Sequence, residues 1–341
     1  MSAARRPRIG LALGSGSARG LAHIGVIRAI EEADIPIDCI AGTSMGALIG
    51  AVYAADKLDE LEATFQAFNW KKTLSFFDVV LPKSGLLDGA KISELVRDHV
   101  RAETLEALLK PFRAVATDIA SGEEVVIASG DVIEAVRASI SVPGIFTPVR
   151  SGERVLVDGG LTNPVPVSVA RAMGADIVIA VDLNHQIVAG KNLKPLLNQE
   201  QPVAGNPRAE EGNPASTLFA RWVGEYRASM GELRQRLLAG ETPLSGQFTR
   251  WLSSEEALPS IFEVLLASIN IMEARITQTR LGLDRPEVLI QPPLGHIRFL
   301  EFGRAEEIIA IGYEHAKKQL SNQAQLLRPW STLNSGVMEL I

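Results

Sequence analysis

The order of apolar segments in the first 55 residues constrains the fold of this chain more than any other feature. A short apolar run, Ile9–Leu13, ends in glycines and is followed by Leu21–Ala33, whose apolar residues have helical spacing. A second apolar run, Ile37–Ala41, is followed by a second helical segment, Ala47–Ala55. Strands that alternate with helices usually lie parallel in one sheet, with helices on both faces. The sequence therefore predicts a three-layer α/β/α fold with a mainly parallel central sheet.

The alternation continues along the chain and predicts one domain over residues 8–320. A polar stretch rich in glycine, proline and asparagine, at about 186–216, interrupts it as a surface insertion, and 321–341 form a weakly patterned tail. Further strands are expected at Phe112–Thr117, Glu124–Ala128, Arg154–Val157, Ile177–Val181 and Glu287–Ile290. Further helices are expected at Ile92–Val100, Val132–Ser139, Val165–Met173, Glu255–Thr279 and Ala305–Leu320.

Composition limits both the kinds of partner and the cellular compartment that we expect for this chain. A net charge of −6 argues against nucleic acid, because phosphate binding requires an excess of basic residues. The sequence has no stretch of 18 or more uncharged apolar residues, so we expect no membrane span. The N-terminal apolar run is too short for a signal peptide. The single cysteine, Cys39, cannot form an intramolecular disulfide and favours a reducing compartment. We expect a cytoplasmic protein, with peripheral contact at the inner membrane surface left open.

The turn Gly42-Thr43-Ser44-Met45-Gly46 joins the second strand to the second helix. A serine in a G-x-S-x-G turn between strand and helix is held exposed at the end of a sheet. Such a turn is crowded, so the positions two before and two after the serine must be small. The helix also directs the positive end of its dipole at the serine, where it would stabilise a developing oxyanion. This context indicates that Ser44 is a nucleophile, although a capping serine in a glycine-rich turn has the same local pattern.

The first strand ends in a second glycine-rich turn, Gly14-Ser15-Gly16-Ser17-Ala18-Arg19-Gly20, which opens a helix. Loops of this kind present several backbone N–H groups to an anion, either a dinucleotide phosphate or an oxyanion. The dinucleotide pattern G-x-G-x-x-G is not met, because Arg19 stands where its third glycine belongs. The simpler interpretation is that this loop supplies oxyanion donors around Gly16 and Ser17, with Met45 as a further candidate, while the other turn supplies the nucleophile.

A serine nucleophile needs a base, and a carboxylate is the better candidate than a histidine. None of the histidines lies in a recognisable catalytic pattern, although His185 follows a strand end and stays open. Asp158 follows the apolar strand Val155–Val157 directly and precedes Gly159 and Gly160. We therefore expect Asp158 at the carboxyl end of a strand of the parallel sheet, where sites in such folds form. Asp118 and Asp182 also follow strands, and we interpret them as turn-forming residues outside the site.

These three motifs, in this order, resemble the patatin-like phospholipases, and most closely the bacterial branch related to neuropathy target esterase. The resemblance covers residues 8–185, with Asp284–Pro293 as a late strand of the same domain. It departs from the family in the glycine loop, where Ser15 and Ser17 replace glycines of many relatives. Supporting stretches are Ala116-Thr117-Asp118, Ser139–Pro143 followed by Gly144-Ile145-Phe146, and Asn163-Pro164-Val165-Pro166.

The resemblance implies a serine acyl-ester hydrolase of the phospholipase A or lysophospholipase type, with no metal or cofactor. Asp158 would take the place of the histidine of a triad, accept the proton of Ser44 and later activate water against the acyl-enzyme. Burial should raise the pKa of Asp158 above the ordinary value of about 3.9. Arg19 would either orient the glycine loop, form a structural salt bridge or meet a lipid headgroup.

Other interpretations stay open. The same dyad would serve a general carboxylesterase or an acyltransferase, and a non-catalytic, membrane-associated regulatory protein would keep the fold. Five aromatic residues cluster in Phe65–Phe77, beside Lys71 and Lys72. They form either an ordinary packing cluster, the simpler interpretation, or a lid that contacts the membrane. The sequence does not determine the acyl chain, the headgroup or the oligomeric state.

Overall fold

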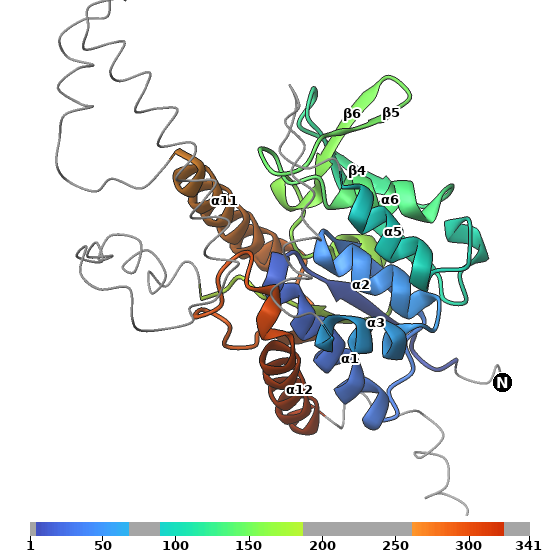
Figure 1. Ribbon diagram of the computed structural model, residues 1–341. Helices are drawn as coiled ribbons and strands as arrows, with labels where there is room; N and C mark the ends of the chain where they lie inside the picture. Colours follow the sequence, from blue (N-terminus) through green and yellow to red (C-terminus); the bar gives the residue numbers. More distant parts are fainter. Residues whose placement is uncertain (1–4, 68–88, 187–260, 324–341) are drawn as a thin grey trace, which may run out of the picture.

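A computed structural model describes residues 5–67, 89–186 and 261–323 of the chain (Figure 1). The strands are β1 (Ile9–Leu13), β2 (Cys39–Thr43), β3 (Phe112–Asp118), β4 (Glu124–Ile127), β5 (Val149–Ser151), β6 (Arg154–Asp158), β7 (Ile177–Val181) and β8 (Val288–Ile290). The α-helices are α1 (Ala22–Glu32), α2 (Met45–Ala54), α3 (Leu58–Gln66), α5 (Ala90–His99), α6 (Val132–Ser139), α7 (Val167–Ala172), α11 (Ile261–Leu283) and α12 (Ala305–Asn322). Short 3-10 helices are η1 (Ser17–Leu21), η2 (Leu105–Ala107), η3 (Gly159–Leu161) and η4 (Phe302–Arg304).

The strands form one mixed sheet. Pairing runs in the order β5, β6, β3, β2, β1, β7, β8, and β4 pairs with β3 off this path. Five strands form a parallel set, in the order β3, β2, β1, β7, β8. The other pairs are antiparallel: β4 with β3, β6 with β3, and β5 with β6. Parallel neighbours cannot be joined by a tight hairpin, so the chain leaves the sheet through helices between them. The predicted mainly parallel sheet is confirmed, with an antiparallel part beyond β3.

Two strands share one edge of β3 and meet end to end along it. β2 pairs with β3 as far as Thr43 opposite Val115, and β6 continues from Asp158 opposite Ala116. β4 pairs with residues 114–117 of β3, and some of these residues also pair with β2 and others with β6. Because a strand has two edges, β4 occupies one edge of β3, and β2 and β6 both lie on the other. Because β2 runs parallel and β6 antiparallel to β3, their carboxyl ends face each other.

This topology corrects one expectation. Asp158 lies at the carboxyl end of its strand, but β6 runs antiparallel to β3 rather than parallel. The residue therefore reaches the site because the register places it next to the end of β2, and not because all strands end at one edge.

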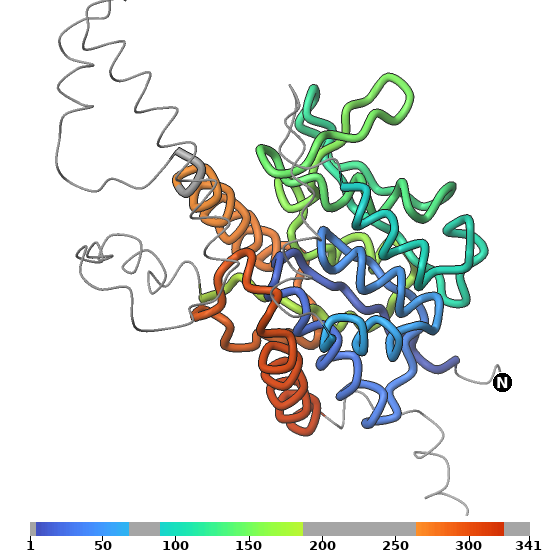
Figure 2. Tube along the Cα trace, viewed as in Figure 1, coloured from blue at the N-terminus to red at the C-terminus, as the bar shows by residue number. Residues whose placement is uncertain are grey.

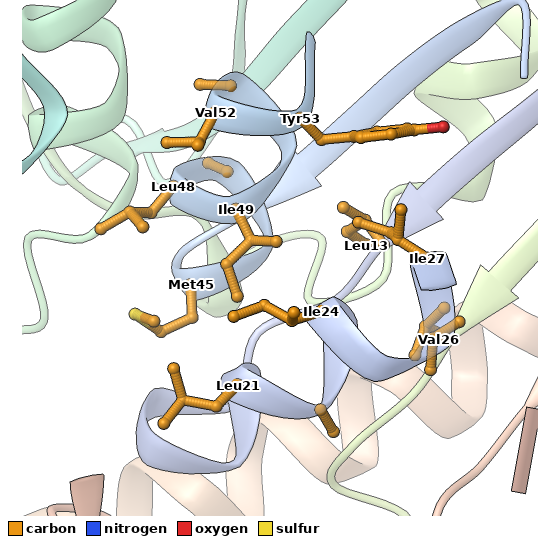
Figure 3. Packing of buried hydrophobic residues seen from close by; sticks show 14 of the residues in the cluster. Leu13, Leu21, Ile24, Val26, Ile27, Met45, Leu48, Ile49, Val52 and Tyr53 are labelled. Atoms are coloured by element: carbon orange, nitrogen blue, oxygen red, sulfur yellow. The ribbon is translucent and has the colours of Figure 1, made fainter. Parts of the chain in front are cut away.

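Alternate strand residues face two separate cores, as the two-residue period of a strand requires. On one face, Leu11, Leu13 and Ile40 pack against α1, α2 and α12 in the larger core. On the other, Ala12, Cys39 and Ala41 pack against α7 in a smaller core of short side chains. Figure 3 shows the larger core, in which Leu13 lies among side chains of α1 and α2. Helices on both faces confirm the three-layer α/β/α fold.

The last helix closes the fold against the first. Gly25 of α1 and Gly312 of α12 let the two backbones touch, since an added Cβ would lie 2.0 Å from Ile309 O and 2.3 Å from Ala22 O, respectively. Figure 2 shows the blue N-terminal and red C-terminal segments side by side. The segment after residue 260 is therefore part of the same packed unit as the first strand.

Element boundaries differ from the sequence expectation in a few places. β2 begins at Cys39 and continues to Thr43, and α2 begins at Met45, so strand and helix leave only Ser44 between them. The sequence predicted neither α3 nor β5. The expected insertion and tail lie outside the described residues, except for Gln186 and residues 321–323. None of the described helices is both long and apolar enough to cross a membrane.

Candidate active site

Ser44 occupies a strained turn between β2 and α2. Its backbone has φ 56° and ψ −124°, in a sparsely populated region that costs a non-glycine residue about 1–3 kcal/mol. The flanking glycines are required by contact: a Cβ on Gly42 would lie 2.4 Å from Gly46 O, and one on Gly46 would lie 2.1 Å from Leu13 O. The predicted crowding of this turn therefore exists, and it holds the serine in one conformation.

The side chains of Ser44 and Asp158 are in direct contact. Ser44 Oγ donates a 2.6 Å hydrogen bond to Asp158 Oδ2. The other carboxylate oxygen accepts the Gly160 N–H at 2.7 Å, which fixes the orientation of the carboxylate. Both residues are buried. The structure thus brings together the serine and the carboxylate that the sequence proposed as a pair.

Burial raises the pKa of Asp158 to about 6, although the hydrogen bonds from Ser44 and Gly160 oppose that shift. A carboxylate removed from water is destabilised relative to its neutral acid, which makes it a stronger base. A base with a pKa near the working pH combines the ionised state with a useful affinity for a proton. The site therefore suits general-base chemistry at near-neutral pH.

The glycine loop lies against the elbow and leaves backbone donors free. Gly20 packs on Met45, since a Cβ at position 20 would lie 2.4 Å from Met45 Cβ. The Gly14 N–H donates a hydrogen bond to Val181 O, and the Ser15 N–H donates one to Pro164 O. Among the described residues, no acceptor is found for the N–H groups of Gly16, Ser17 or Met45. Ser17 has a positive φ of 48°, which bends the loop at this point. These three N–H groups are therefore the candidates for oxyanion donors.

Several residues support the site through backbone contacts that the sequence did not assign. Ser139 Oγ accepts the Ser44 N–H at 2.9 Å and donates to Val115 O at 2.6 Å. The Ser44 amide is therefore occupied and is not an oxyanion donor. Thr43 Oγ1 donates to Asn163 O at 2.8 Å, so the segment that begins at Asn163 holds both the elbow and, through Pro164, the glycine loop.

Two residues that the sequence analysis missed meet at the glycine loop. Glu273 of α11 is 5% exposed, and its Oε2 accepts hydrogen bonds from Ser15 Oγ at 3.0 Å and Asn184 Nδ2 at 3.2 Å. Asn184 follows β7 and also contacts Ser15. A charged residue on the buried stripe of a long helix, between Ile269 and Thr277, is the signal that would have drawn attention to Glu273.

Arg19 and His23 are both buried at the glycine loop. Arg19 is buried, and burial lowers its pKa to about 10; its guanidinium donates to Asn270 Oδ1 and Ile297 O. It therefore joins the loop to α11 and to the segment before η4, and it does not reach the surface. His23 bonds Gly14 O at 2.7 Å, and burial lowers its pKa to about 4, so it is neutral. No histidine in the described ranges hydrogen bonds Ser44 or Asp158, and His185 is among those that do not.

The two other strand-end aspartates form turns, as expected. Asp118 Oδ1 accepts the Ala120 N–H, and Asp182 Oδ1 accepts the Asn184 N–H. A cavity of about 520 Å³ opens beside Asn184, between α11 and the ends of β7 and β8. Its lining comprises Asp182, Asn184, His185, Ala274, Thr277, Gln278, Leu281, Gly282 and Gln291. Within the described ranges, no group of three or more histidine, cysteine or carboxylate side chains is placed to hold a metal ion.

The chain is similar to one family model, to several known sequences and to a solved structure. The family model described as patatin-like phospholipase matches residues 11–171. The NTE family protein Rv1063c of Mycobacterium tuberculosis is 34% identical over 92% of this chain and 91% of its own length. Patatin-like phospholipase domain-containing protein 7 of Mus musculus is 27% identical over 91% of this chain but only 20% of its own. Among solved structures, VipD from Legionella pneumophila aligns over 94% of this chain and 68% of its own, with a TM-score of 0.42 and 15% identity.

Proposed function

Since this chain belongs to the patatin-like phospholipase family and is related to its NTE proteins, we propose that it hydrolyses acyl esters of lipids through a Ser44–Asp158 dyad. The observation that carries this proposal is the 2.6 Å hydrogen bond from Ser44 Oγ to Asp158 Oδ2 at a strained turn. Because the two side chains are already hydrogen bonded, a nucleophile and a base in these roles would need little reorganisation before attack.

In the acylation step, Ser44 Oγ attacks the ester carbonyl carbon while its proton passes to Asp158 Oδ2. The carbonyl oxygen becomes an oxyanion, which the N–H groups of Gly16, Ser17 and Met45 would stabilise. Each such donor is worth about 10²–10³ in rate in related chemistry. Collapse of the tetrahedral intermediate expels the alcohol, which takes the proton from Asp158 and leaves the acyl group on Ser44.

In the deacylation step, Asp158 takes a proton from a water molecule as that water attacks the acyl-enzyme. The second tetrahedral intermediate releases the fatty acid and returns the proton to Ser44. The pKa of Asp158, raised by burial to about 6, suits both directions of proton transfer. Asp158 thereby replaces both the histidine and the aspartate of a conventional triad.

The enzyme is proposed to meet its substrate by peripheral contact with a membrane surface, from the cytoplasmic side. Of the expected aromatic contact region, Phe65 is buried in the core, and residues 68–77 lie outside the described residues. Support comes instead from α11, where Val264, Leu265, Ile271 and Met272 are exposed. Clustered exposed apolar side chains are typical of lipid-binding surfaces.

The catalytic proposal is tested by labelling with a fluorophosphonate probe, followed by a screen of lysophospholipids and short-chain esters. We expect the wild type to be labelled and to hydrolyse a subset of these esters, and Ser44→Ala to do neither. Absence of labelling in folded wild type would overturn the proposal.

The membrane proposal is tested by co-sedimentation with vesicles of phosphatidylcholine and phosphatidylglycerol. Replacing Ile271 and Met272 together by serine should lower the bound fraction, whereas Leu283→Ser, an equally apolar exposed site at the far end of α11, should not. Equal binding of all three proteins would rule out this surface.

A further inference from the structure

Helix α11 places a second buried carboxyl group in the site, 258 residues away in sequence from its partner Ser15. Glu273 Oε2 accepts hydrogen bonds from Ser15 Oγ and from Asn184 Nδ2, at 3.0 and 3.2 Å. Ser15 is part of the glycine loop, whose neighbouring N–H groups are the candidate oxyanion donors. One oxygen of Glu273 is thus committed to holding that loop.

The other oxygen of Glu273 faces the turn that carries Asp158. A Cβ on Gly160 would lie 2.3 Å from Glu273 Oε1 and 3.1 Å from Asp158 Oδ1. Gly160 therefore stands between the two carboxyl groups, and only a residue without a side chain fits there. The same Gly160 donates its N–H to Asp158 Oδ1. Glu273 thus touches the glycine loop on one side and the backbone that orients Asp158 on the other.

We infer that Glu273 is a positioning residue that joins the glycine loop to the Asp158 turn and stays protonated during turnover, which leaves Asp158 as the ionised carboxylate of the pair. This inference rests on the proposed roles of Ser44 and Asp158. Glu273 touches neither the nucleophile nor, in the described geometry, the reacting atoms.

The location of the proton follows from the hydrogen bonds. Oε2 accepts two donors and therefore behaves as the carbonyl oxygen, so the proton belongs on Oε1, the oxygen that faces Gly160. A neutral Glu273 avoids placing two negative charges side by side in a buried site, where their repulsion is poorly screened.

The charged groups around Glu273 are consistent with that order of ionisation. Burial and the charge of Asp158 raise the pKa of Glu273 to about 8, against the opposing effects of the Ser15 hydrogen bond and of Arg19 in η1. The charge of Asp182, which follows β7, favours the charged form of Arg19 and so raises its pKa. On α11 itself, Arg275 is exposed. With the pKa of Asp158 near 6, there is a range of about pH 6–8 in which Asp158 is ionised and Glu273 is not.

Ionisation of Glu273 above that range should slow the reaction. A second negative charge beside the glycine loop opposes formation of the oxyanion, which is also negative. Glu273→Gln keeps the shape of the side chain and an oxygen that accepts from Ser15, but it cannot ionise. Ser15→Ala removes a hydrogen bond that favours the ionised form, so it should shift the ionisation of Glu273 to higher pH.

The test is the rate of fluorophosphonate labelling of Ser44 between pH 5 and 10. The wild type and the control Glu306→Gln, an exposed glutamate on α12, should both lose rate above about pH 8, to about a tenth of the maximum at pH 9. Glu273→Gln should keep the acid limb near pH 6 and lose the alkaline limb. Ser15→Ala should move the alkaline limb upward. An alkaline limb in Glu273→Gln that matches the wild type would overturn the inference.

Thermal melting from pH 4 to 9 tests the inference without activity. A carboxyl with a raised pKa in the folded state stabilises the fold below its unfolded pKa, and this contribution is lost as pH rises through the folded pKa. Glu273→Gln should therefore show a flatter decline in melting temperature up to about pH 8 than Glu306→Gln. Parallel curves would refute a proton on Glu273, even if the wild type is never labelled and the catalytic proposal itself fails. If Glu273→Gln does not fold, an unmoved alkaline limb in Ser15→Ala would refute it.

Discussion

Ser44 Oγ lies 2.6 Å from Asp158 Oδ2, although the two residues are 114 positions apart. The contact follows from the meeting of β2 and β6 along one edge of β3, where Thr43 and Asp158 stand opposite the consecutive residues Val115 and Ala116. Strand register thus sets the distance between nucleophile and base to within one residue spacing. A sheet provides a rigid support for such a pair, because a slip of one residue would turn every side chain to the other face.

Asp158→Asn should abolish most of the esterase activity while the protein stays folded. The amide keeps an oxygen that can accept from Ser44 or Gly160, but it has no useful affinity for a proton. Loss of a general base lowers rates by about 10²–10⁴. The measurement is kcat/KM on a short-chain ester, with Asp118→Asn as the matched control, since Asp118 also ends a strand and accepts a turn N–H. Full activity in folded Asp158→Asn would exclude the dyad.

Activity should rise with pH through about 6. Burial raises the pKa of Asp158 to about 6, and only its ionised form accepts the Ser44 proton, so the rate falls as pH drops below that value. The effect on stability has the opposite sign: protonation favours the folded state, and stability is lost as pH rises from about 4 through 6. The measurements are the pH dependence of kcat/KM and of melting temperature.

Asp158→Asn provides the control for the stability part of this prediction. It removes the titrating group, so its melting temperature should change less between pH 4 and 6.5 than that of Asp118→Asn. A half-maximal rate near pH 4 in the wild type, the value for an ordinary aspartate, would contradict the role of burial.

Much of the site was predictable from local sequence because its features are local. The elbow at Ser44 depends on a strand, a helix and two glycines within five residues. A Cβ on Gly42 would meet Gly46 O and one on Gly46 would meet Leu13 O, which is the predicted crowding. The glycine loop is likewise a short segment after a strand. Local patterns of this kind also predicted most of the strands, with boundaries wrong by one or two residues at β2 and α2.

The features that escaped prediction depend on long-range register. The antiparallel direction of β6 has no signature in Arg154–Asp158, because the same apolar run suits either direction. Glu273 was missed for a similar reason. Its helix lies more than 200 residues after Ser15, and a glutamate is an ordinary helix residue until its contacts are known.

Ser139→Ala should destabilise the protein and lower activity. Ser139 Oγ bridges the Ser44 N–H and Val115 O, and removing it leaves both buried backbone groups without a partner. An unsatisfied buried group costs about 1–3 kcal/mol. The strained turn at Ser44 also loses a restraint, so kcat should fall. The measurements are urea unfolding and ester hydrolysis.

Ser268→Ala is the matched control for that substitution. Ser268 is an exposed helix serine whose hydroxyl donates to Val264 O within its own helix, so its loss should change stability by less than about 0.5 kcal/mol. If both variants unfold at the same urea concentration, the bridge from Ser139 does not stabilise the elbow.

Gly46→Ala should prevent stable folding, although alanine is normally the better helix residue. Its Cβ would lie 2.1 Å from Leu13 O, which belongs to the backbone of the central strand and cannot move without breaking the sheet. Gly282→Ala, near the end of α11, meets no atom within 4 Å and should stabilise the protein by up to about 1 kcal/mol. Both positions are helical, so intrinsic propensity favours alanine at each, and only the contact with β1 distinguishes them. Circular dichroism and melting temperatures of the two variants measure the difference. A folded, active Gly46→Ala protein would show that α2 can withdraw from β1, and the strict geometry assigned to the Ser44 turn would then be wrong.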